Sequence, residues 1–373
     1  MSGSSRCIPN DDSSLKTVDA HQELVRSLSR IVQGLPAQPG PGTGLYAGST
    51  SISYLFWRLS QIYPELLISN KRLIVLCLKY LERSKQSQGI GGKVDSAHCG
   101  VANEHLAQLA LEAAISKDVA LLHELCSYSS MVTSTSDSGS DEWLYGRAGY
   151  LYFLRMVRAS FKDDTDALTL IRNTIEAVVR RISASPQPWV WHGKAYLGAA
   201  HGAIGILVQI VLSLPDSASD VQAMLAKLLD LQFPTGNFPS SLPVDGDRLV
   251  QFCHGAPGFV ISLVSLRPHF PELQNKIDAA IEAGRKATWE RGLLTKTPCL
   301  CHGIAGNVLA LADGGAMEHF MSHMSSAALA KQDMLDEDEH RDDGLYTGEA
   351  GRAWAWAVVD KQLERTCIGF NDL

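Results

Sequence analysis

The sequence predicts an all-α protein in which seven helix pairs form two concentric rings, an α/α toroid. Three features of the chain support this prediction: a glycine motif recurs seven times, an apolar segment follows each copy, and an amphipathic segment lies between copies. No stretch shows the sustained alternation of apolar and polar residues that is typical of a half-buried strand. Repeats of this length are units that bury their apolar faces by stacking on their neighbours.

The motif consists of a glycine, two further residues, a second small residue and then an apolar run. In the first two copies Ser51 and Asn103 replace the second glycine. One such motif is common by chance, whereas seven copies roughly 50 residues apart indicate a repeat architecture. The first glycines of the seven copies are Gly48, Gly100, Gly146, Gly202, Gly255, Gly303 and Gly348.

Each repeat offers one buried helix and one amphipathic helix. After Gly205, Gly258 and Gly351 the chain reads ILVQIVLSL, FVISLVSL and RAWAWAVV, which are apolar on most helical faces. Between the copies, as in residues 165–184 and 272–289, apolar residues recur at helical spacing along one stripe. The two kinds of helix predict an inner and an outer layer.

Closure into a ring is favoured over an open solenoid, because an open solenoid needs polar capping repeats. The last copy continues as AGRAWAWAVV and is strongly apolar. We therefore expect residues 44–373 to form one seven-repeat toroid, and residues 1–43 to form an N-terminal arm and an outer helix that closes the ring. The glycine turns then lie at one end, where the converging N-termini of the inner helices are mildly electropositive.

The composition is that of a soluble globular protein. The chain has 373 residues, of which 45% are hydrophobic and 20% charged, and its formal net charge is −7 at pH 7. This charge argues against a nucleic-acid-binding protein. The longest apolar stretch, residues 195–212, contains a histidine, a glutamine and several glycines, so we expect no integral membrane span. Eight cysteines are too sparse for a disulfide framework, and the first residues lack the apolar segment of a signal peptide, so we expect a cytoplasmic protein.

Three consecutive copies place cysteine or histidine directly before the first glycine. The fourth copy reads AHG, and the fifth and sixth both read CHG. Because equivalent positions of adjacent repeats are adjacent in space, Cys253, Cys301 and His302 form a candidate zinc site with three ligands. Three protein ligands leave a position for a substrate, as in catalytic zinc sites. His254 and His201 are each an alternative fourth ligand, which would make the site structural.

Simpler interpretations exist for the same residues. A cysteine before a glycine is most often a small buried residue, and His201 taken alone is most simply a buried, hydrogen-bonded histidine. Cys299 lies out of register with the candidate ligands. Arg147 and Arg352 sit just inside the motifs of their repeats, where either can bind an anionic substrate or cap a neighbouring carbonyl, and Glu349 is a candidate partner for one of them.

The chain resembles the lanthionine synthetase C-like (LanC-like) family, in particular its eukaryotic glutathione-binding branch. The resemblance covers most of the chain from about residue 44 onward, and we know no other family with CHGAPG and CHGxxGN in this order. The segments that carry it are DEWLYGRAGYLYFL (141–154), WVWHGKAYLGAAHGAIGI (189–206), PTGNFPSS and DRLVQFCHGAPG (within 234–258), CLCHGIAGN (299–307) and GLYTGEAG (344–351).

The resemblance implies an α/α toroid of seven inner and seven outer helices. It also implies one Zn²⁺ per chain, held by Cys253, Cys301 and His302. The histidine of the family's Ala-His-Gly motif, here His201, is the implied acid or base. A bacterial acidic residue in the third repeat aligns best with Glu142, which we take as the second catalytic residue.

The substrate-binding residues also follow from the resemblance. Lys296 lies five residues before the second zinc cysteine, where the eukaryotic branch has a lysine associated with glutathione. We assign His254 and Arg352 to substrate binding beside it. Leu249 stands where the bacterial relatives have an arginine, and Arg248 is one place away.

These assignments predict an enzyme that activates a thiol. A free thiol is mostly protonated at neutral pH, and coordination to zinc deprotonates it. The thiolate of glutathione then adds to dehydroalanine or dehydrobutyrine in a peptide or protein, with His201 moving the proton. The alternatives are a non-catalytic glutathione- and zinc-binding adaptor or sensor, a zinc enzyme of the prenyltransferase type, which would need an aspartate ligand, and a structural zinc site with four protein ligands.

Overall fold

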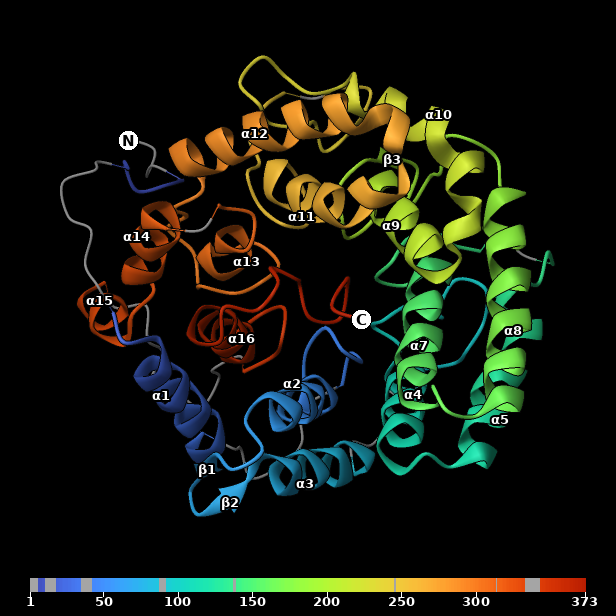
Figure 1. Ribbon diagram of the computed structural model, residues 1–373, viewed down its shortest axis with the longest axis horizontal. Coiled ribbons are helices and arrows are strands. Elements are labelled where there is room, and N and C mark those ends of the chain that lie inside the picture. Colours follow the sequence, from blue (N-terminus) through green and yellow to red (C-terminus); the bar gives the residue numbers. More distant parts are fainter. Residues whose placement is uncertain are drawn as a thin grey trace.

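The structure is a computed structural model that describes residues 6–10, 18–34, 42–86, 92–136, 139–244, 246–312, 314–332 and 343–373. These residues form a ring of helices in two layers (Figure 1). The inner layer of the described chain comprises α2 (Ser49–Ile62), α4 (Glu104–Ser116), α7 (Arg147–Ser160), α9 (Ala203–Ser213), α11 (Ala256–Leu266), α13 (Ile304–Val308) and α16 (Glu349–Asp360).

An outer helix backs each inner helix. The outer layer comprises α3 (Leu73–Lys85), α5 (Val119–Ser127), α8 (Thr165–Ser183), α10 (Ala218–Leu229), α12 (Gln274–Arg291), the pair α14 (Gly315–His323) and α15 (Ser326–Lys331), and α1 (Ala20–Gln33). Helix α1 packs on α16, so the N-terminal part of the chain supplies the outer partner of the last inner helix. The remaining calls on the arm at residues 1–5, 11–17 and 35–41 lie outside the described residues.

The ring is closed. The inner helices contact one another in the order α2, α4, α7, α9, α11, α13, α16, and α16 contacts α2. The predicted α/α toroid is therefore confirmed for the described residues, and the layers match the sequence pattern. Helix α9 is buried on nearly all faces, whereas α8 buries one stripe that includes Ile171, Ile175 and Val178.

Short elements connect the helices. The smallest α-helix is α6 (Ser129–Val132), and 3₁₀ turns occur at Pro215–Ser217, Arg267–His269 and Pro271–Leu273. Strands β1 (Leu67–Ile68) and β2 (Lys71–Arg72) form an antiparallel hairpin, and β3 (Ala195–Tyr196) pairs antiparallel with β4 (Ser241–Leu242). Strands of two residues are too short to show an alternating pattern in the sequence.

The second glycine of the motif lets each inner helix pack against the loop before it. A Cβ atom at Gly149 would lie 2.1 Å from the carbonyl oxygen of Trp143, six residues earlier, and real Cβ atoms do not come this close. The same clash with the carbonyl six residues earlier recurs at Gly205, Gly258, Gly306 and Gly351. The five glycines are thus a steric requirement of one repeated turn.

The two degenerate copies use different contacts. The hydroxyl of Ser51 donates to the carbonyl of Gly48 at 2.7 Å, and Asn103 caps α4 by accepting the backbone N–H of Leu106 at 2.9 Å. Both are hydrogen bonds that a short polar side chain makes at a helix start. Ser51 lies in the first turn of α2, which begins one residue after Gly48, whereas Asn103 is itself the N-cap of α4, which begins four residues after Gly100.

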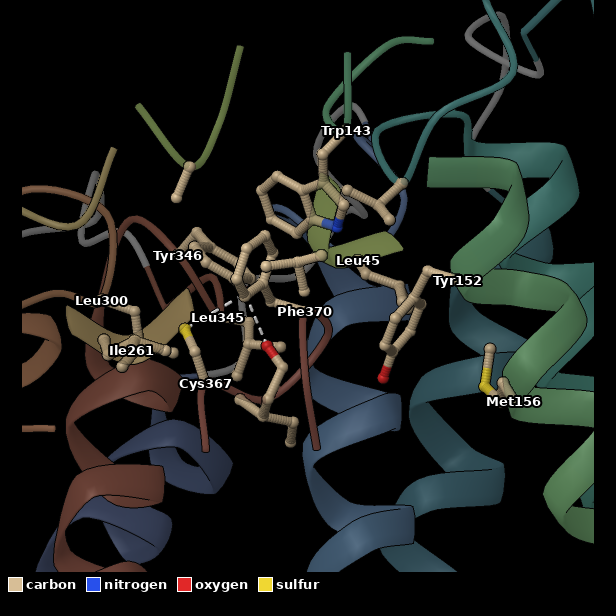
Figure 2. Packing of buried hydrophobic residues seen from close by; sticks show 14 of the residues in the cluster. Leu45, Trp143, Tyr152, Met156, Ile261, Leu300, Leu345, Tyr346, Cys367 and Phe370 are labelled. Carbon is tan, nitrogen blue, oxygen red and sulfur yellow. Dashed lines mark hydrogen bonds between the residues drawn. The ribbon is translucent and has the colours of Figure 1, made fainter. Parts of the chain in front are cut away.

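The C-terminal segment fills the centre of the ring (Figure 1). The ring of Phe370 is fully buried and meets the edges of Trp143 and Phe252, with centroids 5.5 Å and 5.2 Å away. Figure 2 shows Trp143, Tyr346 and Phe370 grouped in this core. Arg155 donates a hydrogen bond of 2.9 Å to the Phe370 carbonyl. Trp143 follows Glu142 in the sequence, and Phe252 precedes Cys253. This core therefore packs against the loops that carry these two predicted site residues.

The described helices include none with the length and apolar character needed to cross a bilayer.

Candidate active site

The motif loops are joined to one another at one end of the toroid. A backbone hydrogen bond links each of six neighbouring pairs of loops. Outside the second copy the bonded residues lie two or three places before the first motif glycine, so equivalent positions of these repeats lie side by side, as the sequence argument requires. In the second copy the bonded residue is Val101, one place after Gly100. The six bonds are Leu45 N–H to Val101 O, Val101 N–H to Trp143 O, Leu144 N–H to Ala200 O, Cys253 N–H to Cys301 O, Cys301 N–H to Tyr346 O, and Tyr346 N–H to Tyr46 O.

Two of the three pairs among the predicted metal ligands interact. The backbone N–H of Cys253 donates to the Cys301 carbonyl at 3.1 Å, and both cysteines are buried. Interaction with Cys301 lowers the pKa of the Cys253 thiol, whereas interaction with Cys253 raises the pKa of the Cys301 thiol. His302 acts on Cys301 in the opposite sense and lowers its pKa. The two thiols therefore titrate as a coupled pair.

The chemistry of this donor set suits zinc. Two thiolates and an imidazole are ligands that Zn²⁺ accepts, and the two cysteines are buried side by side in neighbouring loops. Throughout the ranges that the structure describes, no three His, Cys, Asp or Glu side chains are already spaced as ligands around an ion. The fit accordingly rests on ligand type and on the two pairwise contacts.

The predicted catalytic pair is also assembled. Nδ1 of His201 lies 3.0 Å from Oε2 of Glu142. The Glu142 side chain is buried and accepts the backbone N–H groups of Leu144 at 2.7 Å and Tyr145 at 2.5 Å, so it is fixed in place. The indole of Trp191 stacks on the imidazole, with centroids 4.0 Å apart and planes at 5°. A carboxylate at Nδ1 holds the proton there and leaves Nε2 as the basic nitrogen.

His254 lies between these two groups. Its ring centroid is 6.3 Å from that of His201 and 5.6 Å from that of Tyr196, and it follows Cys253 directly. Burial, and secondarily the neighbouring His201, lowers the pKa of His254 to about 4, so the ring is neutral at pH 7. Its Nδ1 is buried, and no other described residue hydrogen-bonds to it.

Lys296 lies in a cationic cavity next to the cysteines. A cavity of about 210 Å³ is lined by Arg6, Arg248, Gln251 and Lys296. Gln251 links the cavity to the sulfurs, because its Nε2 donates to Sγ of Cys253 at 3.1 Å. The charge of Lys296 also helps to lower the pKa of Cys253. The cavity therefore places positively charged side chains near the thiols of Cys253 and Cys301.

Arg6 reaches this cavity through backbone pairing. Its carbonyl accepts the N–H of Thr295 at 3.2 Å, and the N–H of Ile8 donates to Leu293 at 2.7 Å. This short segment thus lies beside the loop that precedes Cys301. Nothing in the sequence near Arg6 marked it as a site residue, because the pairing joins segments that are far apart in the chain.

Arg352 does not join the site. Its side chain is fully buried and donates to Oε1 of Glu349 at 2.6 Å and to the carbonyl of Met324 at 2.9 Å. The contacts of Arg352 are those of the alternative interpretation, a carbonyl cap with Glu349 as partner, and its assignment to substrate binding stays a prediction. Arg147 is similarly buried, paired with Asp141 at 2.7 Å.

Sequence reasoning missed Trp191 and Gln251 as site residues. The hydroxyl of Tyr46 donates to Sγ of Cys301 at 3.2 Å. Tyr46 lies two residues before a motif glycine, as Tyr346 does, and the sequence left open whether it lines the cavity or simply packs. Gln251 lies two residues before Cys253, where its direction depends on the turn that follows.

Comparison with known proteins places these features in a family. A family model described as lanthionine synthetase C-like protein matches residues 41–314. LanC-like protein GCL1 of Arabidopsis thaliana is 30% identical over 253 residues, which are 62% of this chain and 58% of that protein. Glutathione S-transferase LANCL1 of Danio rerio is 32% identical over 182 residues, which are 45% of this chain and 44% of that protein.

The chain thus spans about half the length of the curated relatives that it matches. Both relatives are eukaryotic, as the resemblance predicted. The family match covers well over half of the chain and includes the loops that carry His201, Cys253 and Cys301. This protein therefore belongs to the lanthionine synthetase C-like family.

Proposed function

We propose that the protein is a zinc-dependent enzyme that adds the thiol of glutathione to dehydroalanine or dehydrobutyrine residues of peptides and proteins. The observation that carries the proposal is the contact of two cysteine thiols and a histidine beside a cationic cavity, with the Glu142–His201 pair in a neighbouring loop. The printed name of the Danio rerio relative, a glutathione S-transferase, supports the same chemistry.

Cys253, Cys301 and His302 would hold the zinc. Zinc, when bound, favours the deprotonated form of a thiol at neutral pH. Two cysteine ligands neutralise the charge of the ion, which keeps an incoming thiolate electron-rich. The buried position of both sulfurs limits access of bulk water.

The cationic cavity suits glutathione. The tripeptide carries two carboxylates and one ammonium group, so a pocket containing Arg6, Arg248 and Lys296 complements its charge. Because Gln251 lines the cavity and contacts Cys253, a molecule bound there by its carboxylates has its central thiol near the two sulfurs.

His201 would carry the proton. Addition forms a bond between sulfur and the β-carbon, breaks the π bond of the dehydroamino acid and transfers the thiol proton to the α-carbon. Nε2 of His201 takes the proton and returns it, while Glu142 fixes the orientation of the ring. No leaving group and no change of oxidation state are needed. The reduced thiols that this chemistry requires are consistent with a cytoplasmic location.

The test uses zinc-loaded protein, glutathione and a dehydroalanine peptide. We expect a product heavier by about 307 Da, the mass of one glutathione added across a double bond, at a rate that Cys301→Ala abolishes. His201→Ala should retain glutathione binding and lose turnover. A zinc- and glutathione-binding sensor would instead bind both ligands and form no product above the Cys301→Ala background, and that result would reject the enzyme.

A further inference from the structure

The two cysteine sulfurs each accept a hydrogen bond from a residue outside the predicted ligand set. The hydroxyl of Tyr46 lies 3.2 Å from Sγ of Cys301, and Nε2 of Gln251 lies 3.1 Å from Sγ of Cys253. We propose that Tyr46 and Gln251 are positioning residues that hold the two sulfurs for metal and thiol binding. This inference rests on the zinc site proposed above.

Both donors stand on fixed backbone. The ring of Tyr46 stacks on Tyr346 of the last repeat, with centroids 5.6 Å apart and planes at 8°, and its carbonyl accepts the N–H of Tyr346 at 2.9 Å. Gln251 is buried and exchanges two backbone hydrogen bonds with His254, of 3.1 Å and 3.2 Å. The stacked Tyr46 ring therefore loses little further conformational entropy when its hydroxyl donates to sulfur.

Both groups have a proton to donate. A tyrosine hydroxyl carries one and an amide NH₂ group carries two, and each points at a sulfur here. A donor at each sulfur fixes the direction in which that sulfur presents its remaining lone pairs to an ion or a thiol. Residues that hold metal ligands by hydrogen bonds commonly contribute 10- to 100-fold to metal affinity, and we expect effects of about this size here.

The two residues are predicted to differ in their effect on glutathione. Gln251 lines the cationic cavity with Lys296, so it connects the carboxylate-binding pocket with the sulfur of Cys253. Tyr46 approaches Cys301 from the first repeat and does not line that cavity. Loss of the Gln251 amide should therefore raise the KM for glutathione, whereas loss of the Tyr46 hydroxyl should mainly lower kcat.

The test compares Tyr46→Phe and Gln251→Leu with matched controls. Tyr150→Phe also removes a buried hydroxyl, one that donates to the Leu125 carbonyl, and Gln232→Leu removes an amide that donates to two carbonyls. Zinc affinity is measured by competition with a chelating dye, and stability by thermal unfolding of the same samples.

We expect Tyr46→Phe and Gln251→Leu to bind zinc roughly 10- to 100-fold more weakly than wild type, with melting temperatures no lower than those of their controls. Affinities equal to those of the controls would overturn the inference while leaving the proposed function intact. A wild-type protein that binds no zinc would overturn both. Equal changes of KM in the two variants would refute the separate role of Gln251.

Discussion

Replacing Arg352 with methionine tests whether this residue stabilises the fold or binds substrate. The guanidinium donates to Oε1 of Glu349 from both Nη2, at 2.6 Å, and Nε, at 3.1 Å, and caps the Met324 carbonyl at 2.9 Å. It also lies 3.7 Å from a carboxylate oxygen of Glu23. Methionine keeps most of the volume and removes the charge and every donor.

The expected loss of unfolding free energy follows from the Glu349 carboxylate, which stays buried after the substitution. Glu349 keeps only Arg30, whose Nε is 4.0 Å away, as a nearby cation among the charge pairs of the described chain. Removing one partner of a buried ion pair costs about 3–5 kcal/mol of unfolding free energy, because the other charge is left uncompensated. The double variant Glu349→Gln with Arg352→Met should recover part of this loss, since it leaves one fewer unpaired charge.

The assay is urea unfolding of the wild type and both variants, followed by circular dichroism, together with glutathione titration by calorimetry. We expect lower stability at unchanged glutathione affinity. A loss below about 1 kcal/mol, or a weaker glutathione affinity at unchanged stability, would show that the structural role is wrong and that Arg352 serves the substrate.

Three further predictions concern the framework of the site. Burial raises the pKa of Glu23, but hydrogen bonds and nearby arginines outweigh it and leave the pKa below its ordinary value of 4.5. Its carboxylate therefore stabilises the fold above that pH, and the stability difference between wild type and Glu23→Gln should shrink as unfolding is measured at falling pH below 4.5. Phe370→Ala should cost about 3–5 kcal/mol in urea unfolding, the usual loss for a buried phenylalanine, and a loss under 1 kcal/mol would contradict the packing described. Gly258→Ala places a Cβ 2.0 Å from the Phe252 carbonyl, so its melting temperature should fall, and an unchanged value would mean that the turn can relax.

Most of the fold could be predicted from the sequence repeat. Seven glycine motifs with buried apolar helices after them fixed the number of repeats and the two layers, because only stacking of neighbours buries such helices. The length of each helix was less predictable. Helix α13 has 5 residues and α9 has 11, although an apolar run follows both motifs. The sixth outer position is divided between α14 and α15, a break that helical periodicity alone does not reveal.

The site was predictable where it depends on repeat register. The interactions of Cys301 with Cys253 and with His302 follow from the alignment of motif loops, whereas the resemblance to the family pointed to Glu142 as the partner of His201. Residues that act through side-chain direction or distant backbone pairing were not predictable. Arg352 illustrates the opposite case. It was assigned to substrate binding from its place in the motif. In the structure Glu349, three residues away, holds it inside the wall of the ring.

The most direct test of the central claim is X-ray absorption at the zinc edge, on natively purified protein with and without glutathione. The account predicts stoichiometric zinc with two sulfur neighbours at about 2.3 Å, rising to three when glutathione is added. Protein without zinc, or a sulfur count that glutathione does not change, would contradict it.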